Sequence, residues 1–177
     1  MAVDKTKQTK YAVPLPYPEP KIEEKNIKYT NILLKDYAGS VSEFTAISLY
    51  IYQNFVSYEQ YQNFGTLVEG IAKVEMKHLE LLGETIKLEG VKPVYIDNVR
   101  PPGKFWSPTY VDYETNYKKM LKIDIKAEQD AIKNYKYQLT VIDDKYIKKL
   151  IERIILDEEL HLKLFIQEYE KYNLSNI

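Results

Sequence analysis

Both histidines of the chain, His78 and His161, follow a glutamate by three residues. The two segments read Glu75-Met-Lys-His78 and Glu158-Glu-Leu-His161. On a helix, residues three apart lie on one face about a turn apart, so the carboxylate and the imidazole can bind the same metal ion. Because the pattern occurs twice, it indicates a site for two metal ions.

An internal repeat supplies two more glutamates. Residues 43–53 and 128–138 share the pattern E-x-x-A-I-x-x-Y-x-Y-Q, which begins at Glu43 and at Glu128. Each half of the chain therefore carries one glutamate followed later by one Glu-x-x-His. Such self-similarity indicates that the two halves form the same supersecondary unit.

The composition excludes several classes of protein. The chain has 177 residues, 45% hydrophobic and 29% charged, with a net charge of −1 and no cysteine. We expect one ordinary domain and no nucleic-acid partner, because there is no basic excess. The lack of cysteine excludes disulfides and iron–sulfur clusters. The polar N-terminus and the lack of a long apolar run predict no signal peptide, no membrane contact and a cytoplasmic location.

Residues 11–20 contain four prolines and should run extended over the surface or against a partner subunit. We therefore expect residues 1–23 to form a proline-rich N-terminal segment and residues 24–177 to form a helical bundle. Residues 91–108 are also rich in proline and should form a long irregular connection. Apolar spacing and capping residues predict helices at about 24–37, 40–58, 62–89, 109–140 and 144–171.

Several residues mark the expected helix ends. Ser40 or Ser42 should begin the second helix, Gly90 should follow the third, and Asp143 or Asp144 should begin the last. Ser107-Pro108 is typical of an N-cap followed by proline at the first helical position, which predicts the start of helix 109–140.

Short turns join helix 40–58 to 62–89 and helix 109–140 to 144–171, so each pair should be an antiparallel hairpin. Within each hairpin the two glutamates lie about equally far from the turn, roughly 24 Å at 1.5 Å per residue. Facing helices would therefore bring them to the same height. The long connection predicts an all-α antiparallel four-helix bundle with one crossover between its second and third helices.

The expected centre of the bundle holds Glu43, Glu75, His78, Glu128, Glu158 and His161. Four buried carboxylates without counter-charge would be strongly destabilising, and two divalent cations would cancel their charge. Carboxylate oxygens with one imidazole per ion suit iron or manganese, both of which change oxidation state. Zinc would bind the same set without redox chemistry.

These motifs resemble the ferritin-like family of di-iron and di-manganese carboxylate proteins, which includes bacterioferritin, rubrerythrin and manganese catalase. The resemblance covers about residues 40–170 and implies that the six residues are the metal ligands. Either Glu75 and Glu128 or Glu43 and Glu158 would be bridging, and the sequence leaves this open. The resemblance also implies a catalytic place beside the metals for Tyr50 and Tyr135, although ordinary core tyrosines would fit.

Asp157 resembles the aspartate that some relatives use to orient the opposite histidine, here His78, although an exposed Asp157 fits the sequence as well. Its counterpart in the other half is the apolar Val74, so we expect His161 to lack such a partner.

Some features depart from individual relatives. No cysteine is present for a rubredoxin-type iron, and Ala131 replaces the second glutamate usual in rubrerythrins. Any electron donor must therefore be a separate molecule. Met76 stands where bacterioferritin binds haem, but a core or dimer-contact methionine fits better. Few residues follow Glu170, so we expect no fifth helix and no storage cage. Residues 75–82 and the proline-rich crossover most resemble the manganese-catalase and spore-coat catalase-like branch of the family.

The sequence thus predicts an oxidoreductase with two iron or two manganese ions that removes peroxide or reduces O₂. The alternatives are a metal-binding coat-type protein without turnover, ferrous-iron oxidation for storage, and a metal-free bundle with solvated glutamates. We expect a homodimer, in which residues 11–20 could clasp the partner.

Overall fold

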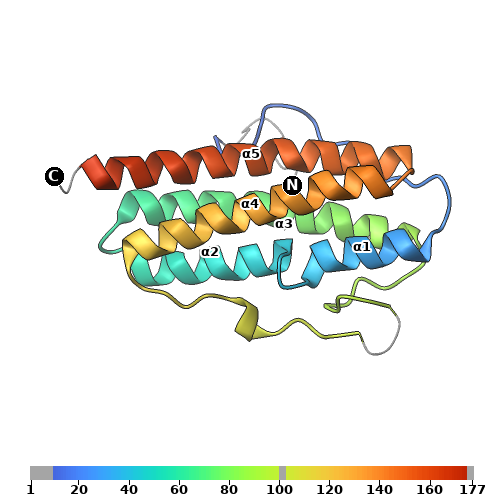
Figure 1. Ribbon diagram of the computed structural model, residues 1–177, viewed down its shortest axis with the longest axis horizontal. Helices are drawn as coiled ribbons and strands as arrows, with labels where there is room; N and C mark the ends of the chain where they lie inside the picture. Colours follow the sequence, from blue (N-terminus) through green and yellow to red (C-terminus); the bar gives the residue numbers. More distant parts are fainter. Residues whose placement is uncertain (1–9, 100–102, 175–177) are drawn as a thin grey trace, which may run out of the picture.

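The structure is a computed structural model that describes residues 10–99 and 103–174. Figure 1 shows long helices packed side by side, with α1 and α2 following one another along one edge. The helices are α1 (Ile27–Ala38), α2 (Glu43–Ser57), α3 (Gln62–Leu88), α4 (Tyr117–Val141) and α5 (Lys145–Leu174), with one 3₁₀ turn, η1 (Pro108–Tyr110). The predicted all-α bundle is confirmed, and α2 with α3 and α4 with α5 form the two expected hairpins.

Side-chain caps explain where most of the helices begin. Asn26, Ser42 and Asn116 each accept a backbone N–H from the first turn of α1, α2 and α4. Asp144 Oδ1 accepts the N–H groups of residues 146 and 147 at the start of α5. Such caps satisfy donors that have no partner inside the helix. Of the alternatives considered from sequence for α2 and α5, Ser42 and Asp144 are the residues that cap.

The predicted start of helix 109–140 is wrong. Ser107 and Pro108 begin only the 3₁₀ turn η1, and α4 starts at Tyr117 after the cap Asn116. Between them, Asp112 Oδ1 accepts the N–H of Glu114, and Glu114 Oε1 accepts those of residues 115 and 116. These local side-chain bonds compete with helical ones and delay the helix. The other predicted ends agree with the structure to within three residues.

The connection from α3 to α4 is the predicted crossover. It begins at Gly90, whose φ of +87° is the left-handed conformation expected directly after a helix. Its described parts run along the side of α1 and α2 (Figure 1). Its residues 91–99 and 103–107 contain one isolated bridge, between Ile96 and Phe105, and no helix.

The apolar core is divided in two along the bundle. One cluster takes Phe64–Val74 from α3 and Phe165 from α5, and the other takes Leu81–Ile86 and Ile147–Ile155 from the same helices. The predicted ligands lie between these clusters on both helices. A polar layer is therefore enclosed by apolar side chains at both ends, which keeps it from bulk water.

Residues 10–23, called here the N-terminal strap, run extended along α5 of their own chain (Figure 1). The carbonyls of Val13 and Leu15 accept bonds from Arg153, and the Glu23 N–H donates to Asp144. The expectation of an extended surface segment is confirmed. The division of the chain at residue 23 stays a prediction, and residues 1–9 lie outside the described residues.

None of the helices in residues 10–99 and 103–174 combines the length and apolar character needed to cross a membrane.

Candidate metal centre

The four long helices bring all six predicted ligands together. Glu43 comes from α2, Glu75 and His78 from α3, Glu128 from α4, and Glu158 and His161 from α5. The glutamates are 1–4% exposed and both histidines are 0% exposed. The alternative of glutamates on solvated helix faces is therefore wrong.

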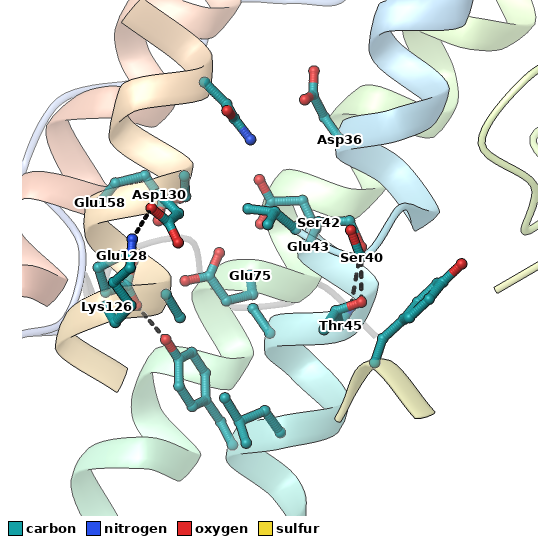
Figure 2. Close-up of a pocket in the computed structure, with 18 of the residues that line it drawn as sticks. Asp36, Ser40, Ser42, Glu43, Thr45, Glu75, Lys126, Glu128, Asp130 and Glu158 are labelled. Atoms are coloured by element: carbon teal, nitrogen blue, oxygen red, sulfur yellow. Dashed lines mark hydrogen bonds and ion pairs between the residues drawn. The ribbon is translucent and has the colours of Figure 1, made fainter. Parts of the chain in front are cut away.

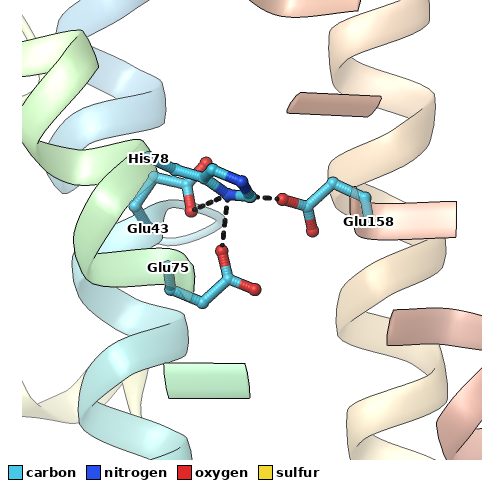
Figure 3. A group of neighbouring side chains, drawn as sticks. All are labelled: Glu43, Glu75, His78 and Glu158. Atoms are coloured by element: carbon cyan, nitrogen blue, oxygen red, sulfur yellow. Dashed lines mark hydrogen bonds and ion pairs between the residues drawn. The ribbon is translucent and has the colours of Figure 1, made fainter. Parts of the chain in front are cut away.

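The six residues form two overlapping groups. In each group the candidate ligand atoms lie within 4.8 Å of one another, and the groups are Glu43, Glu75, His78 and Glu158, and Glu75, Glu128, Glu158 and His161. Figure 3 shows the first group, in which three carboxylates from three helices converge on the His78 ring. Glu75 and Glu158 belong to both groups, which neither of the pairings considered from sequence anticipated. The arrangement fits a dinuclear site with these two as the shared residues.

His78 presents Nδ1 to the carboxylates and Nε2 away from them. Nδ1 is 3.0 Å from both Glu75 Oε2 and Glu158 Oε1, and 3.5 Å from Glu43 Oε2. Nε2 is 3.1 Å from Asp157 Oδ2. A carboxylate at Nε2 favours the proton there, so the neutral ring has its Nδ1 lone pair facing the site. Asp157 is buried, so its predicted contact with His78 is confirmed and the exposed alternative is wrong.

His161 has a partner that the sequence prediction denied it. Its Nε2 lies 2.9 Å from the backbone carbonyl of Tyr11 in the strap. A carbonyl only accepts, so Nε2 must donate, and in the neutral ring Nδ1 carries the lone pair. That Nδ1 is 2.8 Å from Glu75 Oε1, and both atoms lack a hydrogen bond of acceptable geometry. Without metal a proton on Nδ1 makes this contact attractive, and in the neutral ring a cation between Nδ1 and Glu75 can take the place of that proton, which is how the donor set fits a metal.

Two tyrosines hold the remaining glutamates across the bundle. The Tyr50 hydroxyl donates to Glu128 Oε1 at 2.5 Å, and the Tyr135 hydroxyl donates to Glu43 Oε1. Each tyrosine thus binds the repeat-equivalent glutamate of the other half. Both side chains are buried in the core, and burial first, then the carboxylates, raises the pKa of each hydroxyl well above its usual value. They therefore stay protonated donors at neutral pH.

Burial controls the acidity of the glutamates. Burial and neighbouring carboxylates raise the pKa of Glu43 and of Glu128 well above the usual value, and raise the pKa of Glu158 to about 8. Burial acts in the same direction on Glu75, but the charges of His161 and His78 outweigh it and hold the Glu75 pKa well below its usual value. Without metal, protons must compensate charge in this layer, so metal binding should release them.

The glutamine that ends each copy of the repeat binds a buried aspartate, and the sequence prediction missed both of these contacts. Gln53 Nε2 donates to Asp124 Oδ1 and Gln138 Nε2 donates to Asp36 Oδ1, both at 2.7 Å. The two aspartates are buried, and burial raises the pKa of Asp36 to about 7 and that of Asp124 well above its usual value. The repeated glutamine was the available signal, but its partners lie outside the repeated segment.

An apolar pocket reaches the carboxylates from the side of α2 and α4 (Figure 2). Its cavity volume is about 220 Å³, and Glu43, Glu75, Glu128 and Glu158 lie on its wall. The apolar lining comes from Val41, Ala46, Leu49, Ile123, Ala127 and Ala131. The Lys126–Asp130 ion pair belongs to the same lining on α4. A small molecule could therefore reach the carboxylates without displacing the histidines.

Met76 is 45% exposed on α3, so of the two expected roles the core position is wrong and the dimer contact stays a prediction. The spacing explains this, because Glu75 and His78, three residues apart, take the inward face of that turn.

Comparison with known proteins agrees with this geometry. A protein of Clostridium acetobutylicum named probable manganese catalase is 25% identical over 172 residues, which cover 85% of this chain and 74% of that protein. A manganese catalase from Anabaena has the same fold, with a TM-score of 0.81 and 21% identity over 91% of this chain and 80% of that one. The bacterioferritin of Desulfovibrio desulfuricans, which has a di-iron site, matches with a TM-score of 0.66 and 26% identity over 81% of this chain and 78% of that one.

The predicted ferritin-like fold is thereby confirmed. Residues 37–169, which include every predicted ligand, match the family model named Rubrerythrin. The chain belongs to the rubrerythrin family.

Proposed function

We propose that the protein is a peroxide-removing oxidoreductase with a dinuclear manganese or iron centre. The observation that carries the proposal is the pair of overlapping ligand groups, in which Glu75 and Glu158 are shared and each group has its own histidine and its own further glutamate. In this proposal Glu43 and His78 would hold one ion, Glu128 and His161 would hold the other, and Glu75 and Glu158 would contribute to both.

The charges support this assignment. Four buried carboxylates carry four negative charges when ionised, and two divalent cations neutralise them with two neutral imidazoles as further ligands. Both histidines donate from Nε2 to a partner outside the group, which fixes Nδ1 as the ligand atom. The apolar clusters on either side strengthen electrostatic interactions inside the layer, because water is excluded from it.

A bound pair of manganese or iron ions would supply the change of oxidation state that peroxide chemistry requires. The protein supplies the rest. Tyr50 and Tyr135 hold Glu128 and Glu43 by hydrogen bonds, which limits how far these carboxylates can swing. We propose that the two hydroxyls are also the catalytic hydrogen-bond donors next to the reacting oxygen atoms, since each lines the pocket.

The pocket favours a small substrate. A cavity of about 220 Å³ with apolar walls would admit hydrogen peroxide or O₂ and would exclude most of the bulk water. Disproportionation of peroxide, in which two H₂O₂ give two H₂O and one O₂, balances without a further reductant. The manganese-catalase relatives favour this reaction over one that consumes an electron donor. A separate electron donor, a homodimer and a cytoplasmic location stay predictions.

The test is the yield of O₂ per peroxide consumed by protein loaded with manganese or with iron, without added reductant. We expect one O₂ for every two H₂O₂, and no activity in the double variant Glu75→Ala/Glu158→Ala. The matched control is Glu80→Ala/Glu159→Ala, which changes two exposed glutamates on the same helices and should keep full activity.

Other outcomes would select another function. Metal binding without peroxide turnover would favour the coat-type structural protein, in which metal only stabilises the bundle. Oxidation of added ferrous iron with particles many times larger than a dimer would favour storage. Peroxide loss that requires a reductant and yields no O₂ would favour a peroxidase.

A further inference from the structure

The N-terminal strap reaches both histidines of the centre. It runs antiparallel to α5, so Tyr11 meets His161, Val13 meets Asp157, and Leu15 meets Arg153 in order. The strap therefore contacts the side of the centre where the ring Nε2 atoms point. No described strap residue lines the apolar pocket, which opens on the side of α2 and α4.

The contact with His161 is made by the backbone of Tyr11. Its carbonyl accepts from His161 Nε2 at 2.9 Å, and no other hydrogen bond of this nitrogen is found among the described residues. The position of that carbonyl depends on the Tyr11 ring, which lies against Gly70 of α3. A Cβ at Gly70 would come closer than 3.0 Å to three carbon atoms of the ring. The absence of a side chain at Gly70 thus leaves the space that the Tyr11 ring occupies, and this packing holds the strap beside His161.

The contact with His78 is made through Asp157. The Val13 N–H donates to Asp157 Oδ1 at 2.7 Å, and the Tyr17 hydroxyl donates to Asp157 Oδ2 at 2.5 Å. The same Oδ2 accepts from His78 Nε2. Two strap groups therefore fix the carboxylate that orients His78, and the Tyr17 ring packs edge-on against the His78 ring at 5.9 Å.

Arg153 fastens the strap to α5. Its guanidinium donates to the carbonyls of Val13 and Leu15 at 2.8–3.1 Å and pairs with Asp157 Oδ2 at 2.8 Å. It is only 6% exposed. Because this buried arginine donates to backbone carbonyls, it fixes the path of a segment that has no regular secondary structure.

We propose that the strap is a positioning element for the metal centre: Tyr11, Val13 and Tyr17 hold the two histidines in their metal-binding orientation and slow the release of the ions. The proposal rests on the proposed function, because it requires the six residues to bind metal. Groups that orient a metal-binding histidine from behind typically contribute about 10–100-fold in metal affinity. The strap contributes orienting groups for the histidines of both ion sites, although it contributes no metal ligand itself.

The test uses Gly70→Ala in the full-length, metal-loaded protein. The added methyl group should push the Tyr11 ring out of its recess without touching a ligand. We expect the ion bound through His161 to pass to a chromogenic chelator about 10–100-fold faster than in the unaltered protein. Hydrogen exchange of the Val13 amide, measured in the same sample, should also increase, because its bond to Asp157 depends on the same segment.

The matched control is Gly65→Ala, five residues earlier in α3. This glycine is also buried against a tyrosine ring, since its Cβ would lie 2.7 Å from Tyr58 Cδ2, but Tyr58 belongs to the turn after α2 and not to the strap. We expect a similar loss of thermal stability and an unchanged rate of metal release. Equal release rates in the two glycine variants would overturn the proposal.

A second variant keeps the test valid if Gly70→Ala does not fold. Tyr17→Phe removes only the hydroxyl that donates to Asp157. We expect it to accelerate release of the ion bound through His78, so that one of two release phases becomes faster. Release of two ions at the rate of the unaltered protein in every strap variant would refute the strap proposal alone. Failure of the unaltered protein to bind any ion would instead refute the proposed function.

Discussion

The carboxylate side of the centre and its histidine side are built in different ways. On the carboxylate side the internal repeat is reproduced in space: Tyr50 binds Glu128, and Tyr135 binds Glu43. On the histidine side the repeat fails, because His78 is oriented by a side chain, Asp157, and His161 by a backbone carbonyl. The symmetry is kept where both halves carry the same residue, and it is lost where Val74 stands at the counterpart of Asp157 and the Tyr11 carbonyl, from outside the repeat, contacts His161 instead.

We expect the largest effects on metal content from substitutions of the glutamates, with a greater loss for the two that belong to both ligand groups than for the two that belong to one. We expect Glu75→Gln or Glu158→Gln to abolish binding of both ions, because each belongs to both groups. Glu43→Gln or Glu128→Gln should leave one ion bound, because each belongs to a single group. Metal content per chain after dialysis measures this directly. Identical losses in all four variants would contradict the assignment of shared residues.

The asymmetry of the histidine side predicts a selective effect of Asp157→Asn. The change weakens the acceptor for His78 Nε2 and leaves the Tyr11 carbonyl at His161 in place. We expect the affinity for one ion to fall by about 10–100-fold and that for the other to change little. Competition titration with a chelator should therefore become two-phased. An equal weakening of both ions would mean that the two histidines share their outer contacts.

The polar pairs beyond the carboxylates predict a pH effect in the metal-free protein. The Asp36 pKa is raised from 3.8 to about 7, so between these pH values the folded protein binds more protons than the unfolded one. Stability therefore falls as pH rises through this window, by up to about 4 kcal/mol. Asp36→Asn keeps an acceptor for Gln138 and should raise stability at pH 8 but not at pH 4.

Chemical denaturation at the two pH values checks this expectation. Asp124→Asn is the symmetric partner, because its bond to Gln53 repeats the bond between Asp36 and Gln138. Its pKa is raised by the same cause, and we expect the same direction. If Asp36→Asn stabilised the protein equally at both pH values, the ionisation of the buried Asp36 carboxyl could not be the cause of the pH dependence.

The smallest effect should show the symmetry of the carboxylate side. Tyr50→Phe and Tyr135→Phe each remove one hydroxyl from one buried glutamate. We expect each to lower the free energy of unfolding by about 1–2 kcal/mol, with values that agree within experimental error. Thermal unfolding of the two variants side by side is the measurement. A clear difference would show that the repeat is reproduced in geometry but not in energy.

The sequence was sufficient where the argument depended on spacing along helices. Equal distances from two short turns placed Glu43 beside Glu75 and Glu128 beside Glu158, and the structure groups these residues as expected. Sequence reasoning failed where the partner was a backbone atom, because the Tyr11 carbonyl leaves no trace in side-chain identity. It also failed at the start of α4, where Glu114 takes up backbone N–H groups that a helix would need.

The most direct test of the dinuclear centre is elemental analysis of the protein after anaerobic loading with manganese or iron and removal of loosely bound ions. The two ligand groups predict two ions per chain, and none in Glu75→Ala/Glu158→Ala. The element retained more tightly would then indicate which metal to use in the peroxide assay. A chain that retains neither metal would contradict the account, and its buried glutamates would have to be neutralised by protons alone.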